Sequence, residues 1–240
     1  MSNTKSFEVE GGYSLEDLLE MFEGSRVDLS RFADYPKFAL EYFHDKSEIA
    51  DPNLHMTLQL DITSVREKYD RDFAGINSTF TSFLVHKLLL AASGIEFLRY
   101  RFIEGSWYCF DNLPLFFPVA VGGDKRFMEI IIDSPARLSF PDFAEQYCRG
   151  LERIRKSPSD YRPVPNEIWK NIWFIGNLSY MRFTSFGVHL NKRDTGRPIF
   201  YFGQRYQQDG RLYVPLYSRL DHATGDPFIL NEVIESFLSL

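Results

Sequence analysis

Segments with a helical period alternate with segments of strand character along this 240-residue chain, and this alternation limits its fold more than any other feature. Apolar residues three or four positions apart, or a capping residue before an apolar run, predict four helices, at residues 14–22, 80–92, 139–154 and 226–240. Alternating or short apolar runs predict strands between them, at residues 58–62, 113–121, 127–132, 172–178, 198–206 and 212–220. This order of elements predicts an α/β sandwich, a two-layer arrangement of a mixed sheet with helices.

The turns between the predicted strands indicate two hairpins. Residues 122–124, Gly-Gly-Asp, separate the second strand from the third, and residues 207–210, Gln-Gln-Asp-Gly, separate the last two. Pro215 lies inside the last strand and predicts an edge or a bulge there, because proline has no N–H to donate to a neighbouring strand. The chain contains no internal repeat and no low-complexity linker, which favours a single domain.

Charge and hydropathy exclude two classes of partner. The formal net charge is −6, whereas a nucleic-acid-binding protein needs a basic face. The densest basic run, residues 149–156, is typical of a helix end where cations compensate the helix dipole. No stretch approaches the ~18 apolar residues of a membrane span, and the first residues lack the apolar core of a signal peptide. We therefore expect neither nucleic acid nor a membrane among the partners.

The cysteines and histidines indicate no metal site. Cys109 and Cys148 are too few for a disulfide framework, which predicts a cytoplasmic protein with free thiols. Neither lies at a helix start or a strained turn, so buried, inert thiols are favoured over a cysteine hydrolase. The five histidines and two cysteines show no His-x-x-x-His or Cys-x-x-Cys spacing, and glycine patterns for phosphate or dinucleotide binding are absent.

One histidine has a setting that suits chemistry. His222 lies between the last predicted strand and the last helix, followed by the small residues Ala223, Thr224 and Gly225, which leave space beside its ring. Such junctions often hold functional groups in α/β proteins. The residues alone leave two readings open, a catalytic base or a hydrogen-bonded turn histidine. Asp226 before a proline is typical of a helix N-cap, so we expect it to support the His222 turn rather than move protons.

Five segments, in order along the chain, resemble the chloramphenicol acetyltransferase family. The segment from His222 to Asp226 resembles its motif His-His-Ala-Val-Cys-Asp-Gly. The other segments are Leu-Asp-Ile-Thr at 60–63, Phe-Leu-Arg at 97–99, Phe-Thr-Ser-Phe at 183–186, and Tyr-Gln-Gln-Asp-Gly at 206–210 followed by Val-Pro-Leu at 214–216. The resemblance spans residues 28–240 and implies that family's fold. Residues 1–27 are then an N-terminal extension with a short amphipathic helix.

The resemblance also implies a mechanism. His222 would act as general base, taking a proton from the hydroxyl of a small-molecule acceptor as its oxygen attacks the thioester of acetyl-CoA, the co-substrate. Ser185 would donate a hydrogen bond to the resulting oxyanion. Arg205 and Tyr206 stand where the family has a Lys-Tyr pair near the coenzyme. Family members are trimers with active sites between subunits. No metal is implied, and chloramphenicol, hence antibiotic resistance, is one candidate among the acceptors.

The chain departs from the family pattern around this motif. Asp221 replaces its first histidine and is expected to point away from His222, since neighbouring strand residues face opposite sides. Asp34 replaces an arginine that pairs with the motif aspartate, with Arg31 the nearest substitute. Phe202 replaces a threonine near the oxyanion. Two classes of function therefore remain, an active acetyltransferase and a catalytically degenerate protein of the same fold that acts as a binding or assembly module.

Overall fold

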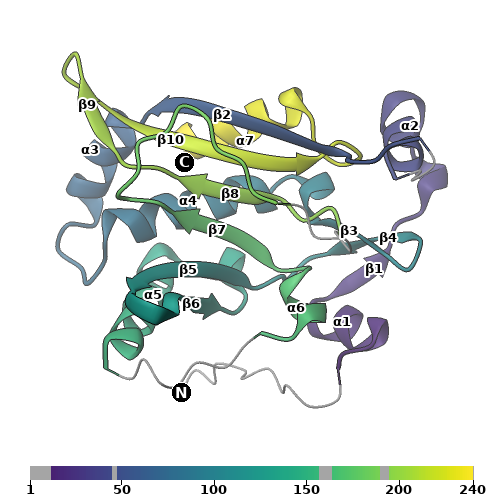
Figure 1. Ribbon diagram of the computed structural model, residues 1–240, viewed down its shortest axis with the longest axis horizontal. Coiled ribbons are helices and arrows are strands. Elements are labelled where there is room, and N and C mark those ends of the chain that lie inside the picture. Colours follow the sequence, from purple (N-terminus) through teal and green to yellow (C-terminus); the bar gives the residue numbers. More distant parts are fainter. Residues whose placement is uncertain (1–11, 45–47, 157–163, 190–194, 240) are drawn as a thin grey trace.

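The computed structural model describes residues 12–44, 48–156, 164–189 and 195–239. Its centre is a seven-stranded sheet in the order β2-β10-β8-β7-β5-β6, with β9 paired to β10 (Figure 1). These strands are β2 (Asn53–Asp61), β5 (Leu115–Gly122), β6 (Arg126–Ile132), β7 (Trp173–Asn177), β8 (Ile199–Phe202), β9 (Tyr206–Gln208) and β10 (Arg211–Asp221). β7 runs parallel to β5 and β8, and the other pairs are antiparallel, so the sheet is mixed, as predicted.

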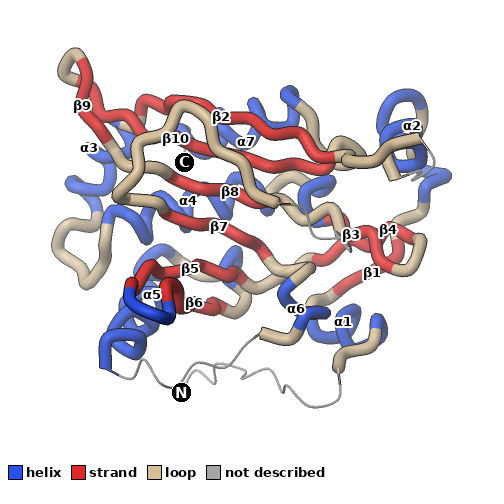
Figure 2. Tube along the Cα trace, in the orientation of Figure 1, coloured by secondary structure: helices blue, strands red, loops and turns tan. Residues whose placement is uncertain are grey.

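A second, three-stranded sheet extends from one end of the first. It is built in the order β1-β4-β3, from β1 (Gly24–Arg26), β4 (Ser106–Phe110) and β3 (Tyr100–Ile103), as the strands in Figure 2 show. None of these strands was predicted, because runs of three to five residues are too short to display a period.

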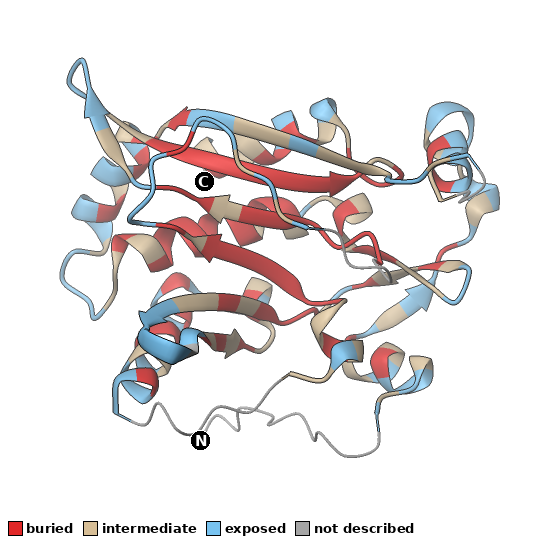
Figure 3. Cartoon of the chain, in the orientation of Figure 1, coloured by how far each residue is buried: buried red, intermediate tan, exposed pale blue. Residues whose placement is uncertain are grey.

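Helices cover one face of the large sheet. The helices of the described chain are α1 (Leu15–Met21), α2 (Asp34–Tyr42), α3 (Thr63–Asp72), α4 (Phe80–Ser93), α5 (Phe140–Lys156), α6 (Asn166–Trp169) and α7 (Pro227–Ser239). α3, α4 and α7 lie behind the sheet in Figure 1, and their apolar side chains form one core cluster with those of the strands. β10, β8 and β7 are the most buried part of the sheet (Figure 3). The two-layer sandwich predicted from the sequence is therefore confirmed.

A row of aromatic rings crosses the other face of the sheet. Phe116, Phe174, Tyr201 and Tyr217 come from four neighbouring strands, with successive ring centroids 5.3, 5.4 and 6.4 Å apart. The segment 178–189, which follows β7, lies across this face, and the ring of Phe186 packs edge-on against Tyr201 and Tyr217. The helices do not cover this face, but the segment 178–189 covers part of it, and Tyr217 is buried there.

The four predicted helices all form, whereas the expectation for Pro215 was partly wrong. β10 lies between β2 and β8, so Pro215 is not on an edge. The irregularity lies in the segment that pairs with β10 on one side. There β8 pairs with residues 216–219 and β9 with residues 211–213, so the pairing is interrupted between them. Between these two pairings the Pro215 carbonyl accepts a hydrogen bond from Gly203 N at 2.8 Å. The missing proline N–H falls in this gap, where no strand needs it.

The N-terminal helix α1 packs into the main core. Ser14 caps it, with Ser14 Oγ accepting from Asp17 N and the Asp17 carboxylate accepting from Ser14 N. Leu18 and Phe22 are buried in the same cluster as α4 and the large sheet. Residues 1–11 lie outside the described residues, and the division into an extension of 1–27 and a domain of 28–240 stays a prediction. In the part that the structure describes, no helix has the length and apolar character needed to cross a membrane.

Candidate functional site

The turn between β10 and α7 is fixed by hydrogen bonds at both ends. The Asp221 carbonyl accepts from Thr224 N at 3.0 Å and from Gly225 N at 2.7 Å. His222 N donates to the carbonyl of Pro52, next to β2, at 2.7 Å. At the far end Asp226 Oδ1 accepts from Ile229 N at 2.9 Å, which makes Asp226 the N-cap of α7. The backbone that presents His222 is therefore well determined.

The imidazole of His222 is held from two sides. Its Nδ1 lies 3.4 Å from the carbonyl oxygen of Gly225, and its ring stacks on Phe43, with centroids 4.0 Å apart. A carbonyl oxygen can only accept, so this long contact places a proton on Nδ1, and in the neutral ring the lone pair is then on Nε2. Nε2 then has a free lone pair, and no hydrogen bond reaches it from any residue that the structure describes. A half-buried imidazole in this state can accept a proton.

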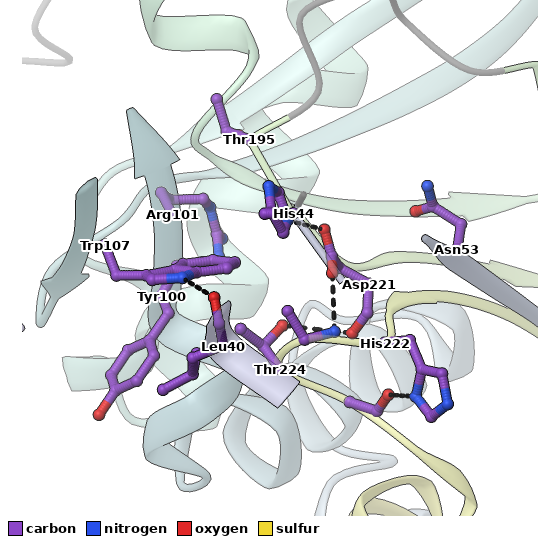
Figure 4. Close-up of polar contacts among 12 residues, drawn as sticks. Leu40, His44, Asn53, Tyr100, Arg101, Trp107, Thr195, Asp221, His222 and Thr224 are labelled. Carbon is purple, nitrogen blue, oxygen red and sulfur yellow. Dashed lines mark hydrogen bonds and ion pairs between the residues drawn. The ribbon is translucent and has the colours of Figure 1, made fainter. Parts of the chain in front are cut away.

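Asp221 points away from His222, as expected for neighbours on a strand (Figure 4). Its Oδ1 accepts from Ala223 N at 2.9 Å, and its Oδ2 lies 2.6 Å from His44 Nε2. The His44 ring packs against Phe102 and Trp107, with centroids 4.4 and 4.6 Å away. Asp221 is therefore part of a buried polar pair behind the turn.

Ser185 lies in the segment that crosses the open face of the sheet, and its side chain is exposed. The carbonyl of its neighbour Phe183 accepts from Gln59 Nε2, and Gln59 lies opposite Pro215. Tyr217, against which Phe186 packs, is five residues before His222. At ~3.3 Å per strand residue, Ser185 and His222 of one chain are about 15–20 Å apart. The structure therefore does not bring these two predicted site residues together within one chain.

Arg205, just before β9, and Tyr206, its first residue, point in opposite directions. The Arg205 guanidinium lies over the Phe80 ring and 3.4 Å from Thr81 Oγ1, at the start of α4, where burial lowers its pKa. The Tyr206 hydroxyl donates to Gln59 Oε1 at 3.1 Å. The guanidinium of Arg182 stacks on the Tyr206 ring at 3.6 Å. Tyr206 is thus next to the Ser185 segment, whereas Arg205 points into the helix layer.

The positions that depart from the family pattern have other uses here. Arg31 pairs with Glu96 and donates to the Tyr100 hydroxyl at 2.6 Å, so the expectation that it might replace the family's arginine is wrong. Phe202 is 1% exposed in the core, and its ring contacts Phe237, so its side chain cannot act on an oxyanion.

Other reactive groups in the described chain give little sign of a second chemistry. Burial raises the pKa of the Cys109 thiol to about 11 and also raises the pKa of Cys148, which keeps both thiols protonated. In the described ranges, three or more His, Cys, Asp or Glu residues do not come together as a metal site would require. A cavity of about 790 Å³ opens beside His44, with Arg26, Glu41 and Trp107 among its lining residues.

Three residues of the site were missed at the sequence level. Phe43 and His44 follow α2, and Arg182 precedes the Phe-Thr-Ser-Phe run. Position next to a recognised motif was the only signal for Arg182. Nothing local marks Phe43 or His44, because their partners are far away in the chain.

A family model, two curated relatives and one solved structure indicate the same family. The family model described as chloramphenicol acetyltransferase matches residues 23–237. A chloramphenicol acetyltransferase of Proteus mirabilis is 25% identical over 212 residues, 86% of this chain and 91% of that protein. A chloramphenicol acetyltransferase of Vibrio anguillarum is 24% identical over 211 residues, which cover 83% of this chain and 90% of that protein. A solved chloramphenicol acetyltransferase structure superimposes with a TM-score of 0.74 at 20% identity, covering 90% of this chain and 98% of that one.

Proposed function

The chain belongs to the chloramphenicol acetyltransferase family, and from that premise we propose that it transfers an acetyl group from acetyl-CoA to a hydroxyl of a small molecule. The observation that supports catalysis most directly is the state of His222. Its Nδ1 is next to a carbonyl oxygen, its Nε2 can accept a proton, and the turn beneath it is capped by Asp226. The pairing of a free imidazole edge with a fixed backbone is what a general base requires.

In the proposed reaction His222 Nε2 takes the proton of the acceptor hydroxyl, and the acceptor oxygen attacks the thioester carbonyl carbon. The tetrahedral intermediate carries an oxyanion, to which Ser185 Oγ–H donates. Collapse of the intermediate breaks the carbon–sulfur bond, and the thiolate of coenzyme A takes the proton back from the imidazolium. The products are the acetyl ester and free coenzyme A, and His222 returns to its neutral form.

The separation of His222 from Ser185 supports an assembly of several copies. About 15–20 Å within one chain is too far for both groups to contact one reacting carbonyl, whereas hydrogen bonds span about 3 Å. We propose that Ser185 of one subunit meets His222 of a neighbour in a homotrimer. The exposed ring of Phe228, 82% accessible and in the first turn of α7, is apolar surface of the kind that subunit contacts cover.

The surroundings of Ser185 suit the two substrates. Arg182 and Tyr206 place a cation and an aromatic ring beside it, which can bind the phosphates and adenine of a coenzyme. Phe116 and Tyr201, the partly exposed rings of the row, offer apolar surface for the acceptor. We therefore assign Tyr206 and Arg182 to the coenzyme and leave Arg205 a supporting role at α4.

Calorimetry with acetyl-CoA and a thiol-release assay test this proposal. The protein is titrated with acetyl-CoA, then assayed with chloramphenicol and a panel of other hydroxyl compounds, with His222→Ala as the control. We expect binding, and release of free thiol that depends on both acceptor and His222. Absence of both binding and turnover would instead support the binding or assembly module. Turnover that persists in His222→Ala would remove His222 from the reaction.

A further inference from the structure

We propose that His44 and Asp221 form a buried positioning pair that holds His222 in its reactive orientation. This inference rests on the proposed function, because it concerns the same reaction. Neither residue contacts the reacting edge of His222. Their effect would pass through Phe43 and through the turn of residues 221–226.

The pair is buried and close. The Asp221 side chain is 1% exposed and that of His44 is 9% exposed, and their atoms Oδ2 and Nε2 are 2.6 Å apart. A carboxylate removed from water needs a partner for each oxygen. Asp221 meets this requirement with Ala223 N on one oxygen and His44 on the other. The carboxylate therefore connects the backbone just after His222 to the chain just after α2.

The connection places Phe43 on the catalytic ring. Phe43 immediately precedes His44, so fixing the His44 ring also fixes where the Phe43 ring lies, and that ring stacks on His222. Phe43 directly follows α2 as its C-cap residue. Figure 1 shows this helix beside the end of β10, apart from the helices behind the sheet.

The pair also explains how the site tolerates its departures from the family pattern. Asp34 stands where an arginine is expected, and Arg31 is bound to Glu96, so neither ties α2 to Asp226 by an ion pair. The residue in place of the motif's first histidine, Asp221, provides a different tie between the same two segments. A misplacement of about 1 Å can cost ~10²-fold in rate, which gives such a tie kinetic weight.

A variant series separates positioning from mere stability. We expect His44→Ala to lower kcat by roughly 10- to 100-fold with little change in the KM for acetyl-CoA. Asp221→Asn should lower kcat as well, and the double variant should be no slower than the slower single variant, because the pair acts as a unit. His44→Gln, whose amide nitrogen reaches the position of Nε2, should recover activity, whereas the shorter His44→Asn should not.

The matched control is His86→Ala. His86 is also a buried histidine packed among rings, with Nε2 3.1 Å from the Leu138 carbonyl, but it lies in α4 far from the turn. Its replacement should lower the melting temperature as much as His44→Ala and leave kcat unchanged. Equal losses of kcat in both variants, or no loss in His44→Ala, would overturn the proposal.

A second measurement distinguishes this inference from the proposed function. Imidazole proton–carbon NMR spectra report the environment of the His222 ring without any substrate. We expect His44→Ala to shift or broaden the His222 signals while those of His86 stay in place. A His222 spectrum unchanged by His44→Ala would overturn the inference. If the wild type turned over no acceptor, the proposed function would fail, and the spectra would still decide the positioning role.

Discussion

The ring of Phe43 lies on the ring of His222, with centroids 4.0 Å apart and planes inclined by 28°. The first ring ends the α2 segment, and the second begins the turn into α7. The stack covers one face of the imidazole and leaves its edge available, so it restricts rotation of the ring without blocking Nε2. Phe43 therefore belongs to the machinery that orients His222.

Phe43→Ala should lower kcat/KM by about three- to tenfold. A ring pair contributes ~0.5–1.5 kcal/mol beyond its buried area, and its loss lets the imidazole leave the reactive orientation. Thiol-release kinetics measure the change. Phe73→Ala is a suitable control, since the Phe73 ring also packs on another ring, that of Phe83 at 5.3 Å, but in a different core cluster from Phe43. Equal kinetic losses in both variants would show that the Phe43 contact has no special role.

Ser185→Ala should lower kcat by ~10²–10³-fold and leave both KM values nearly unchanged, because an oxyanion donor acts mainly in the transition state. The exposed Ser185 side chain should contribute little to stability, so the melting temperature should not move. Steady-state kinetics and a thermal melt measure the two effects. A variant with wild-type kcat would return Ser185 to an ordinary surface hydroxyl.

Glu129 on β6 should make stability depend on pH. Burial raises its pKa to about 7, above the ~4.3 of an unfolded chain. The folded chain thus binds this proton more tightly, and the associated stability is present below about pH 4 and is lost as the pH rises through 7. Glu129→Gln cannot ionise. At pH 8 the free energy of unfolding of Glu129→Gln should exceed that of the wild type by about 1 kcal/mol, and at pH 5 the difference should be smaller. The value of about 1 kcal/mol allows for the partial solvent access of Glu129, which weakens the effect of burial.

Urea unfolding at pH 5 and pH 8 measures this difference. Glu232→Gln on α7, where the carboxylate is exposed, should show no such dependence. If the gap between Glu129→Gln and wild type failed to widen from pH 5 to pH 8, the raised pKa of Glu129 would be wrong.

The sequence predicted those parts of the structure that local chemistry determines. The capping bond of Asp226 and the capping box of Ser14 each join residues three positions apart, so the pattern of residue types is enough to find them. α2 was missed because its N-cap, Ala33, makes no side-chain capping bond, so the sequence carries no capping residue to mark the start of the helix.

Contacts between distant segments could not be predicted in this way. His44 and Asp221 are 177 positions apart, and only the folded sheet and α2 bring them together. The same limit applies to the site as a whole. The resemblance indicated His222 and Ser185, but their separation within one chain became visible only through the pairing of β10 with β2.

Mixed assemblies should recover activity from two inactive variants. His222→Ala keeps Ser185, and Ser185→Ala keeps His222, so a site between subunits can contain both wild-type groups. In randomly mixed trimers roughly a quarter of the sites would be complete, as expected for a cyclic assembly with one site per interface. Co-expression with two tags, followed by thiol-release assays, measures this recovery. Activity no higher than the sum of the two variants would contradict a shared site, as would light scattering from a stable monomer.

The two ends of the His222 turn should respond in opposite ways to substitution. His222 is half-buried, and its side chain makes one long hydrogen bond and the stack on Phe43, so His222→Ala should cost at most about 1 kcal/mol of stability while removing most turnover. Asp226 caps α7, so Asp226→Ala should cost ~0.5–2 kcal/mol and reduce activity only partly, by letting the turn move. Asp226→Asn, which keeps a capping oxygen, should restore both properties. Thermal melts and thiol-release assays on the three proteins measure the profiles. If instead His222→Ala melted early and Asp226→Ala stayed stable but inactive, the two roles would be exchanged. His222 would then be the residue that supports the turn, and Asp226 the residue that moves the proton.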